Sequence, residues 1–148
     1  MGRVTRYQGA VVRDDHLLLI KHHLRGRDYW LIPGGGREDG ETEEACVRRE
    51  IREETHLDVT VGRLLLDEPA PPGSIYRRYK TYLCLPGPGE PSPGHEPEMA
   101  DAQDFAIIQV GWFDLRDESD WDEEVLADPI TYPLLQRVRA ALGYSVGE

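Results

Sequence analysis

A helix that carries three glutamates on one face constrains this chain more than any other feature of its sequence. The run Arg49-Glu50-Ile51-Arg52-Glu53-Glu54 lies in a segment, residues 42–55, with the pattern of an α-helix. Side chains three and four residues apart share a helix face, so Glu50, Glu53 and Glu54 fall within an arc of about 100°. Like charges placed in this way repel, and a divalent cation would remove the repulsion because hard cations prefer carboxylate oxygens. The sequence therefore predicts a helix that presents a cation-binding face.

The rest of the chain is predicted to consist of strands and one more helix. Strands are expected over residues 4–12, 16–22, 29–32, 58–67, 75–85 and 105–110, and the last helix starts near Pro133. The first two strands form a hairpin, and Pro33 with three glycines after it stops the third. Residues 86–104 hold many prolines and glycines and are expected to form a long loop. Strands mixed with two helices indicate an α/β fold in which helices cover a sheet.

Composition and charge narrow the class of protein. At 148 residues the chain is expected to be a single domain, residues 1–148, and it has no apolar run of the ~20 residues that a membrane helix needs. The formal net charge of −11 argues against nucleic acid and anionic membranes as partners. The acidic stretch 117–124 reads as a solvated face. Two cysteines do not make a disulfide framework, so the cytoplasm is the default location.

Residues around the glutamates extend the pattern. Gly35 is followed after five residues by Glu41, and after seven more by the run that starts at Arg49 and continues to Leu57. This arrangement resembles the Nudix box, the signature of hydrolases that act on a nucleoside diphosphate linked to another group. The segment 29–35, Tyr-Trp-Leu-Ile-Pro-Gly-Gly, resembles the usual lead-in to that box. The resemblance implies the Nudix fold, an α/β/α sandwich with a central mixed sheet.

The resemblance also implies a set of roles. Glu50, Glu53 and Glu54 would be the metal ligands, with a backbone carbonyl from the turn at Gly35, and the metal would be Mg²⁺, with Mn²⁺ as a substitute. Divalent metal can neutralise phosphoryl oxygens and activate water, as hydrolysis of a diphosphate requires. Catalysis is assigned to Glu53, which would orient or deprotonate the water, together with Glu50 and Arg49. Arg49 would hold a glutamate by a charge-assisted hydrogen bond, and Glu41 is expected to be a structural partner.

Candidates for substrate binding lie outside the helix. Arg37, beside the glycine turn, and Arg78, on the strand 75–85, are candidate phosphate contacts, and Tyr76 or Tyr79 could stack on a base. Glu98 in the long loop is a candidate for the additional acid that many relatives place after the box. For each of these the alternative is an ordinary exposed or half-exposed residue.

The sequence departs from the family pattern at one position. His56 stands where the family usually has glycine, which often adopts a left-handed conformation after a helix. We expect a tolerated helix end, because histidine enters that region more readily than a β-branched residue does. The alternative is a Nudix domain that senses a nucleotide without hydrolysing it.

The sequence is compatible with more than one class of substrate. Pro71 and Pro72 lie 15 and 16 residues after His56, near an offset that accompanies ADP-ribose pyrophosphatases in this family. We therefore expect a small-molecule nucleotide: ADP-ribose, a related nucleotide sugar, or a nucleoside triphosphate. An isoprenoid diphosphate isomerase would need a longer chain, and the charge makes RNA decapping unattractive. By analogy with many relatives, a homodimer is the oligomeric state that the resemblance suggests.

Overall fold

The first two strands diverge soon after they pair, and this divergence organises the sheet. The computed structural model describes residues 4–95 and 106–145. Strands β1 (Thr5–Arg13) and β2 (His16–Leu24) form the predicted hairpin, in a register that pairs Val12 with Leu17 and Arg13 with His16. Further along, β1 pairs with other strands on both of its edges, and so does β2.

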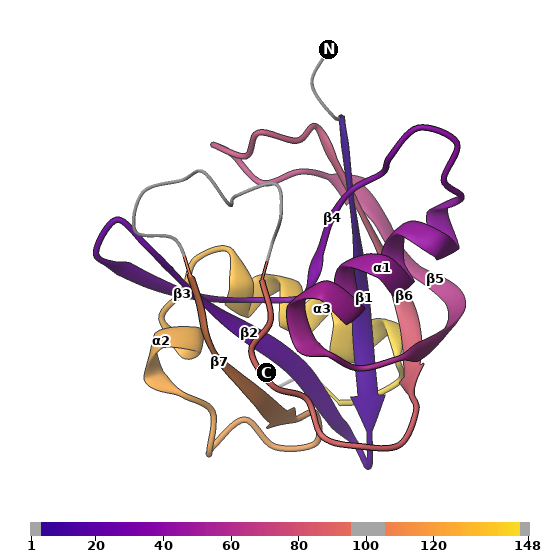
Figure 1. Cartoon of the computed structure of the whole chain (residues 1–148). Helices are drawn as coiled ribbons and strands as arrows, with labels where there is room; N and C mark the ends of the chain where they lie inside the picture. Colours follow the sequence, from indigo (N-terminus) through magenta and orange to yellow (C-terminus); the bar gives the residue numbers. More distant parts are fainter. Residues whose placement is uncertain (1–3, 96–105, 146–148) are drawn as a thin grey trace.

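The sheet is mixed, as predicted. Strand β1 pairs in parallel with β6 (Arg78–Pro86) and antiparallel with β4 (Gly34–Gly36), while β5 (Val59–Pro69) lies antiparallel beside β6. Strand β2 pairs antiparallel with β3 (Arg27–Leu31) and with β7 (Ala106–Asp114). The strands run in the order β3-β2-β1-β6-β5, with β4 added to β1 and β7 added to β2 (Figure 1).

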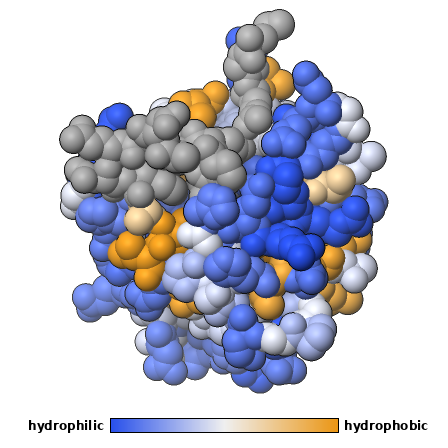
Figure 2. Space-filling model, in the orientation of Figure 1, coloured by the Kyte–Doolittle hydropathy of each residue, from blue (hydrophilic) through white to orange (hydrophobic). Residues whose placement is uncertain are grey.

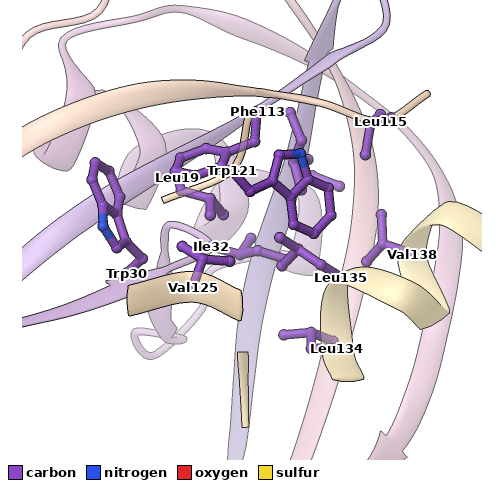
Figure 3. Packing of buried hydrophobic residues seen from close by; sticks show 12 residues of the cluster. Leu19, Trp30, Ile32, Phe113, Leu115, Trp121, Val125, Leu134, Leu135 and Val138 are labelled. Carbon is purple, nitrogen blue, oxygen red and sulfur yellow. The ribbon is translucent and has the colours of Figure 1, made fainter. Parts of the chain in front are cut away.

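Helices cover both faces of this sheet. In Figure 1, α1 (Glu43–Thr55) lies in front of the strands and α3 (Thr131–Ala141) behind them, with the short α2 (Glu123–Leu126) near α3. Alternate side chains of β2 enter two cores: Leu17 and Leu19 pack in the cluster that includes α2 and α3, and Leu18 packs in the cluster that includes α1. Figure 3 shows the first cluster, in which Trp30, Phe113 and Trp121 meet residues of α3. This arrangement confirms the predicted α/β/α layering.

Two predictions of local structure were incomplete or wrong. Gly34 to Gly36 were expected only to stop a strand, but they form β4, because β2 has diverged and left the edge of β1 at residues 6–8 available for pairing. The acidic stretch 117–124 does expose Glu123 and Glu124, but these residues also begin α2, which Asp122 caps and whose Val125 is buried. No helix among the described residues is long and apolar enough to cross a membrane.

Candidate functional site

Helix α1 is fixed at its first turn by a cap and by the sheet. The Thr42 side chain accepts a hydrogen bond from the Ala45 N–H at 3.1 Å, and Glu43 and Glu44 occupy the positive end of the helix dipole. Glu43 accepts hydrogen bonds from Lys80 Nζ and from the Tyr82 hydroxyl on β6. These bonds lower the pKa of Glu43 despite its partial burial, which acts in the opposite direction. The start of the helix is therefore tied to strand β6.

Glu50 lies against the backbone of Gly35. Its side chain is fully buried, and a Cβ atom added to Gly35 would fall 2.5 Å from the Glu50 carboxyl carbon and 2.5–2.6 Å from its oxygens. Real Cβ atoms essentially never approach so closely, so only glycine leaves room for the carboxylate at this position. The close approach puts the Glu50 carboxylate beside the backbone of β4.

Glu54 is held by the same strand. Its residue is fully buried, and its Oε1 accepts a hydrogen bond from the Gly34 N–H at 2.9 Å. Because Gly34 and Gly35 pair with Gln8 and Tyr7 of β1, the sheet itself sets where these two carboxylates lie.

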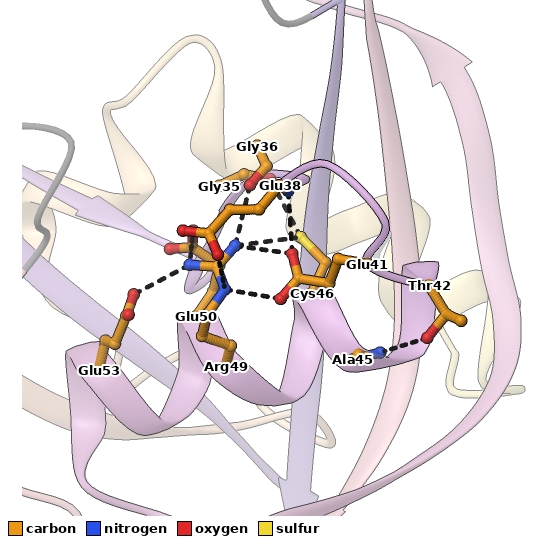
Figure 4. A network of polar contacts seen from close by, with 10 residues as sticks. All are labelled: Gly35, Gly36, Glu38, Glu41, Thr42, Ala45, Cys46, Arg49, Glu50 and Glu53. Carbon is orange, nitrogen blue, oxygen red and sulfur yellow. Dashed lines mark hydrogen bonds and ion pairs between the residues drawn. The ribbon is translucent and has the colours of Figure 1, made fainter.

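Arg49 links carboxylates of the helix to one another and to Glu41. Its Nη1 donates to Glu50 Oε2 at 3.0 Å and to Glu53 Oε1 at 3.2 Å, and its Nε and Nη2 donate to the two Glu41 oxygens at 2.7 and 2.9 Å (Figure 4). Nη2 also donates to the Gly36 carbonyl at 3.1 Å. The bonds to Glu41 raise the pKa of Arg49, and the charges of Glu50 and Glu53 raise it further. The guanidinium is a fixed cation that donates hydrogen bonds to three carboxylates.

The three glutamates of the box differ in exposure. The side chains of Glu50 and Glu54 are buried, whereas the Glu53 side chain keeps 24% of its surface exposed. Among the described residues, no group of three or more acidic, histidine or cysteine side chains forms a preassembled metal cluster, and Arg49 lies among the carboxylates instead. The donor set fits a hard divalent cation, since it consists of carboxylate oxygens beside the close backbone approach at Gly35.

The described residues include two of the predicted phosphate contacts, Arg37 and Arg78. The guanidinium of Arg37 lies 5.8 Å from the centre of the Tyr7 ring. Arg78 forms an ion pair with Asp67 on the neighbouring strand β5 and donates to the Asp67 carbonyl at 3.2 Å. Glu98 lies outside the described residues.

Some residues of the site were missed by sequence reasoning. Lys80 and Tyr82 bind the start of α1 through Glu43, and the carbonyl of Gly36 receives Arg49. Lys80 and Tyr82 lie two residues apart on β6 and so share one face of the strand, but only the pairing of β6 with β1 brings that face under α1. Cys46 is buried in the core beneath the helix.

One hollow lies beside α1, and another lies near the start of α3. One, of about 590 Å³, borders α1 and is lined by Ala45, Arg48, Arg49, Arg52, Glu53, Asp58 and Val59. The surface over α1 is strongly hydrophilic (Figure 2). The other, of about 190 Å³, includes Tyr29, Leu31, Pro71, Pro72, Tyr79 and Thr131 in its lining. Pairing places Gly36, Arg6 and Tyr79 side by side on three adjacent strands, so the backbones of Gly36 and Tyr79 lie about 10 Å apart.

Comparison with known proteins gives concordant matches. The model of the NUDIX domain matches residues 4–131. The NAD-capped RNA hydrolase NudC of Vibrio vulnificus (strain CMCP6) is 36% identical over 97 residues, which cover 65% of this chain and 36% of that protein. The 8-oxo-dGTP diphosphatase of Proteus vulgaris is 46% identical over 46 residues, 31% of this chain and 39% of that protein. The matches thus span well under half the length of these curated relatives.

The fold has solved counterparts. A NUDIX hydrolase from Nitrosomonas europaea superposes with a TM-score of 0.71 at 20% sequence identity, covering 98% of this chain and 94% of that one. At this identity the likeness concerns the fold, and it extends over nearly the whole of both chains.

Proposed function

We propose a hydrolytic function for this chain, which belongs to the Nudix family because the NUDIX domain model matches residues 4–131. The chain cleaves a phosphoanhydride bond in a nucleoside diphosphate derivative, by attack of water on phosphorus. The observation that carries this proposal is the placement of Glu50, Glu53 and Glu54 on one helix, beside a glycine strand and joined through Arg49.

Glu50, Glu53 and Glu54 would hold the metal, with Gly35 adding its carbonyl oxygen. Mg²⁺, or Mn²⁺ in its place, supplies charge neutralisation on the phosphoryl oxygens and lowers the pKa of water when it is bound. Arg49 keeps the carboxylates oriented, because its planar guanidinium bonds Glu41, Glu50 and Glu53 at once.

Glu53 is the best-placed proton acceptor of the three. Its side chain is partly exposed and borders the 590 Å³ hollow, whereas Glu50 and Glu54 are buried. A general base must reach the water that it deprotonates, and exposure at the hollow meets that requirement. Glu98, in the segment outside the described residues, stays a candidate for the additional acid.

The substrate is a nucleotide whose base has a separate hollow to enter. Tyr29 and Tyr79 line the 190 Å³ hollow together with Pro71 and Pro72, and aromatic rings there suit a stacked base. Arg37 can contact a phosphate beside the glycine strand, and Arg78 can do so if it leaves Asp67. ADP-ribose or a nucleotide sugar, and nucleoside triphosphates, are the two substrate classes proposed.

The test compares two glutamates on one helix. Glu53→Gln should lower turnover at least about 100-fold with Mg²⁺ present, while Glu44→Gln, exposed on the first turn, should leave it near wild type. The panel contains ADP-ribose, nucleotide sugars, NAD, nucleoside triphosphates and an NAD-capped RNA, and phosphorus NMR identifies the bond that is cleaved. Circular dichroism checks that both variants fold. Undiminished turnover of Glu53→Gln would remove Glu53 from the mechanism.

A nucleotide sensor is the second candidate, because His56 replaces the glycine of the family pattern. Binding of a panel member without any product, measured by calorimetry and phosphorus NMR on one sample, would favour the sensor over the hydrolase.

A further inference from the structure

The C-terminal end of α1 is covered by a segment that is distant in sequence. The carbonyls of Glu53, Glu54 and Thr55 accept backbone hydrogen bonds from His95, Gly94 and Ser92 at 2.8, 2.8 and 2.9 Å. The preceding carbonyl, of Arg52, accepts from the His56 N–H at 3.0 Å. All four of the last carbonyls of the helix are therefore satisfied. We call residues 92–95 the end clamp.

This end of the helix has particular need of such contacts. The last carbonyls of a helix have no partner inside it, and the dipole makes that end negative. Here the last two turns also carry Glu50, Glu53 and Glu54, whose charges are unfavourable at a negative helix end. Fraying of the last turn would move Glu53 and Glu54, so bonds that hold their carbonyls also hold these side chains.

Gly94 permits the contact. A Cβ atom at this position would lie 1.9 Å from the carbonyl oxygen of Glu53 and 2.9 Å from the carbonyl carbon of Glu54. The obstruction is backbone, which has little room to move, so the end clamp closes on the helix only with glycine at position 94.

His56 supplies a side-chain link to the end clamp. It ends the helix in the left-handed conformation, with φ 63° and ψ 13°, and its Nδ1 lies 2.7 Å from the Ser92 hydroxyl oxygen. Glycine would adopt this conformation at less cost, but it could not make the bond to Ser92. Histidine in place of the family's glycine therefore adds backbone strain but also adds a side-chain bond to Ser92, which we call the tether.

We propose that His56 and Ser92 are positioning residues, which dock the end clamp on α1 and thereby fix Glu53 and Glu54 in the arrangement that binds the metal. This inference rests on the proposed function for its catalytic consequence. The docking itself and metal binding are observable without any substrate.

The decisive variant is His56→Gly. If His56 were only a tolerated helix end, glycine would relieve the left-handed strain and leave every other property unchanged. The proposal instead expects exchange of the Gly94 and His95 amide hydrogens to accelerate about tenfold or more, measured residue by residue by NMR. Mn²⁺ binding, measured by calorimetry, should weaken, and kcat should fall about tenfold with little change in KM.

Two further variants complete the test. Ser92→Ala should reproduce these effects, and combining it with His56→Gly should add little, because both remove the same bond. Arg25→Gly is the matched control: Arg25 is exposed, has a φ of 54° and lies in the β2–β3 turn, so the same strain is relieved away from α1. It should leave amide exchange at Gly94 and Mn²⁺ binding at wild-type values.

The outcomes separate this inference from the proposed function. Unchanged amide exchange and unchanged Mn²⁺ affinity in His56→Gly would overturn the role of the tether, whatever the turnover. If the wild-type protein hydrolysed none of the panel, the proposed function would fail. Amide hydrogen exchange and Mn²⁺ affinity would still decide whether the tether positions the glutamates.

Discussion

At the scale of single residues, His22 shows how burial changes a titrating group. It lies on β2 and is 6% exposed. Burial, with a smaller contribution from the charge of Arg6, lowers the pKa of His22 from 6.5 to about 3. The folded protein therefore keeps this imidazole neutral at a pH where an unfolded chain would protonate it.

The lowered pKa of His22 makes the stability of the folded protein depend on pH. Between pH 6.5 and about 3 the unfolded state binds one more proton at His22 than the folded state, so stability falls as the pH is lowered through that window. Above pH 6.5 the residue contributes no pH dependence. Below pH 6.5 the free energy of unfolding should fall less steeply with decreasing pH in His22→Gln than in the wild type. The difference in slope should be up to about 1.4 kcal/mol per pH unit. Urea unfolding at pH 7.5, 6 and 5 measures the difference, and parallel curves for the two proteins would contradict it.

At the scale of elements, helix α1 depends on contacts at both of its ends. At its start, Thr42 caps the first turn, and Lys80 and Tyr82 of β6 bind Glu43. At its end, the carbonyls of the last turn bond to residues 92–95. These contacts matter because repulsion between the glutamates on one face of α1 opposes both the formation of the helix and its packing on the sheet.

Removing the first cap should destabilise the protein by about 1 kcal/mol. Thr42→Ala deletes the oxygen that accepts the Ala45 N–H, and the loss of a threonine cap typically has this cost. Thr42→Ser keeps the hydroxyl and serves as the control, with stability near wild type. Guanidinium unfolding of the three proteins gives the comparison, and equal destabilisation by alanine and serine would show that the methyl group matters rather than the cap.

At the scale of the whole molecule, the sheet holds an acidic site in a protein whose net charge is negative. The formal net charge is −11, and Glu41, Glu50 and Glu53 share the guanidinium of Arg49. The two hydrophobic clusters on opposite faces of the sheet provide the stability that allows such a site. A divalent cation bound at the glutamates would add to this stability, since it binds the folded state alone.

Mg²⁺ should therefore raise the melting temperature. At a concentration about 100 times the dissociation constant the gain is about 2.7 kcal/mol, which corresponds to a rise of about 5 °C or more for a chain of this size. Calorimetry with MgCl₂, and with NaCl at equal ionic strength as the control, separates binding from screening. Chelation by EDTA should reverse the rise, and Glu50→Gln should reduce it. An equal effect of NaCl would count against specific binding.

The local pattern of the chain was sufficient to predict α1, the face that carries its glutamates, the hairpin and the α/β class. Helical spacing and strand alternation are properties of neighbouring residues, so sequence determined them by itself. Only the tertiary structure decided that Gly34 to Gly36 pair with β1, that Lys80 and Tyr82 meet Glu43, and that residues 92–95 close the end of α1. Each of these contacts joins segments far apart in the chain. Which of them form depends on which strands pair along each edge of the sheet. For the same reason Arg78 could be predicted to lie beside Lys80 on a strand, but not to pair with Asp67.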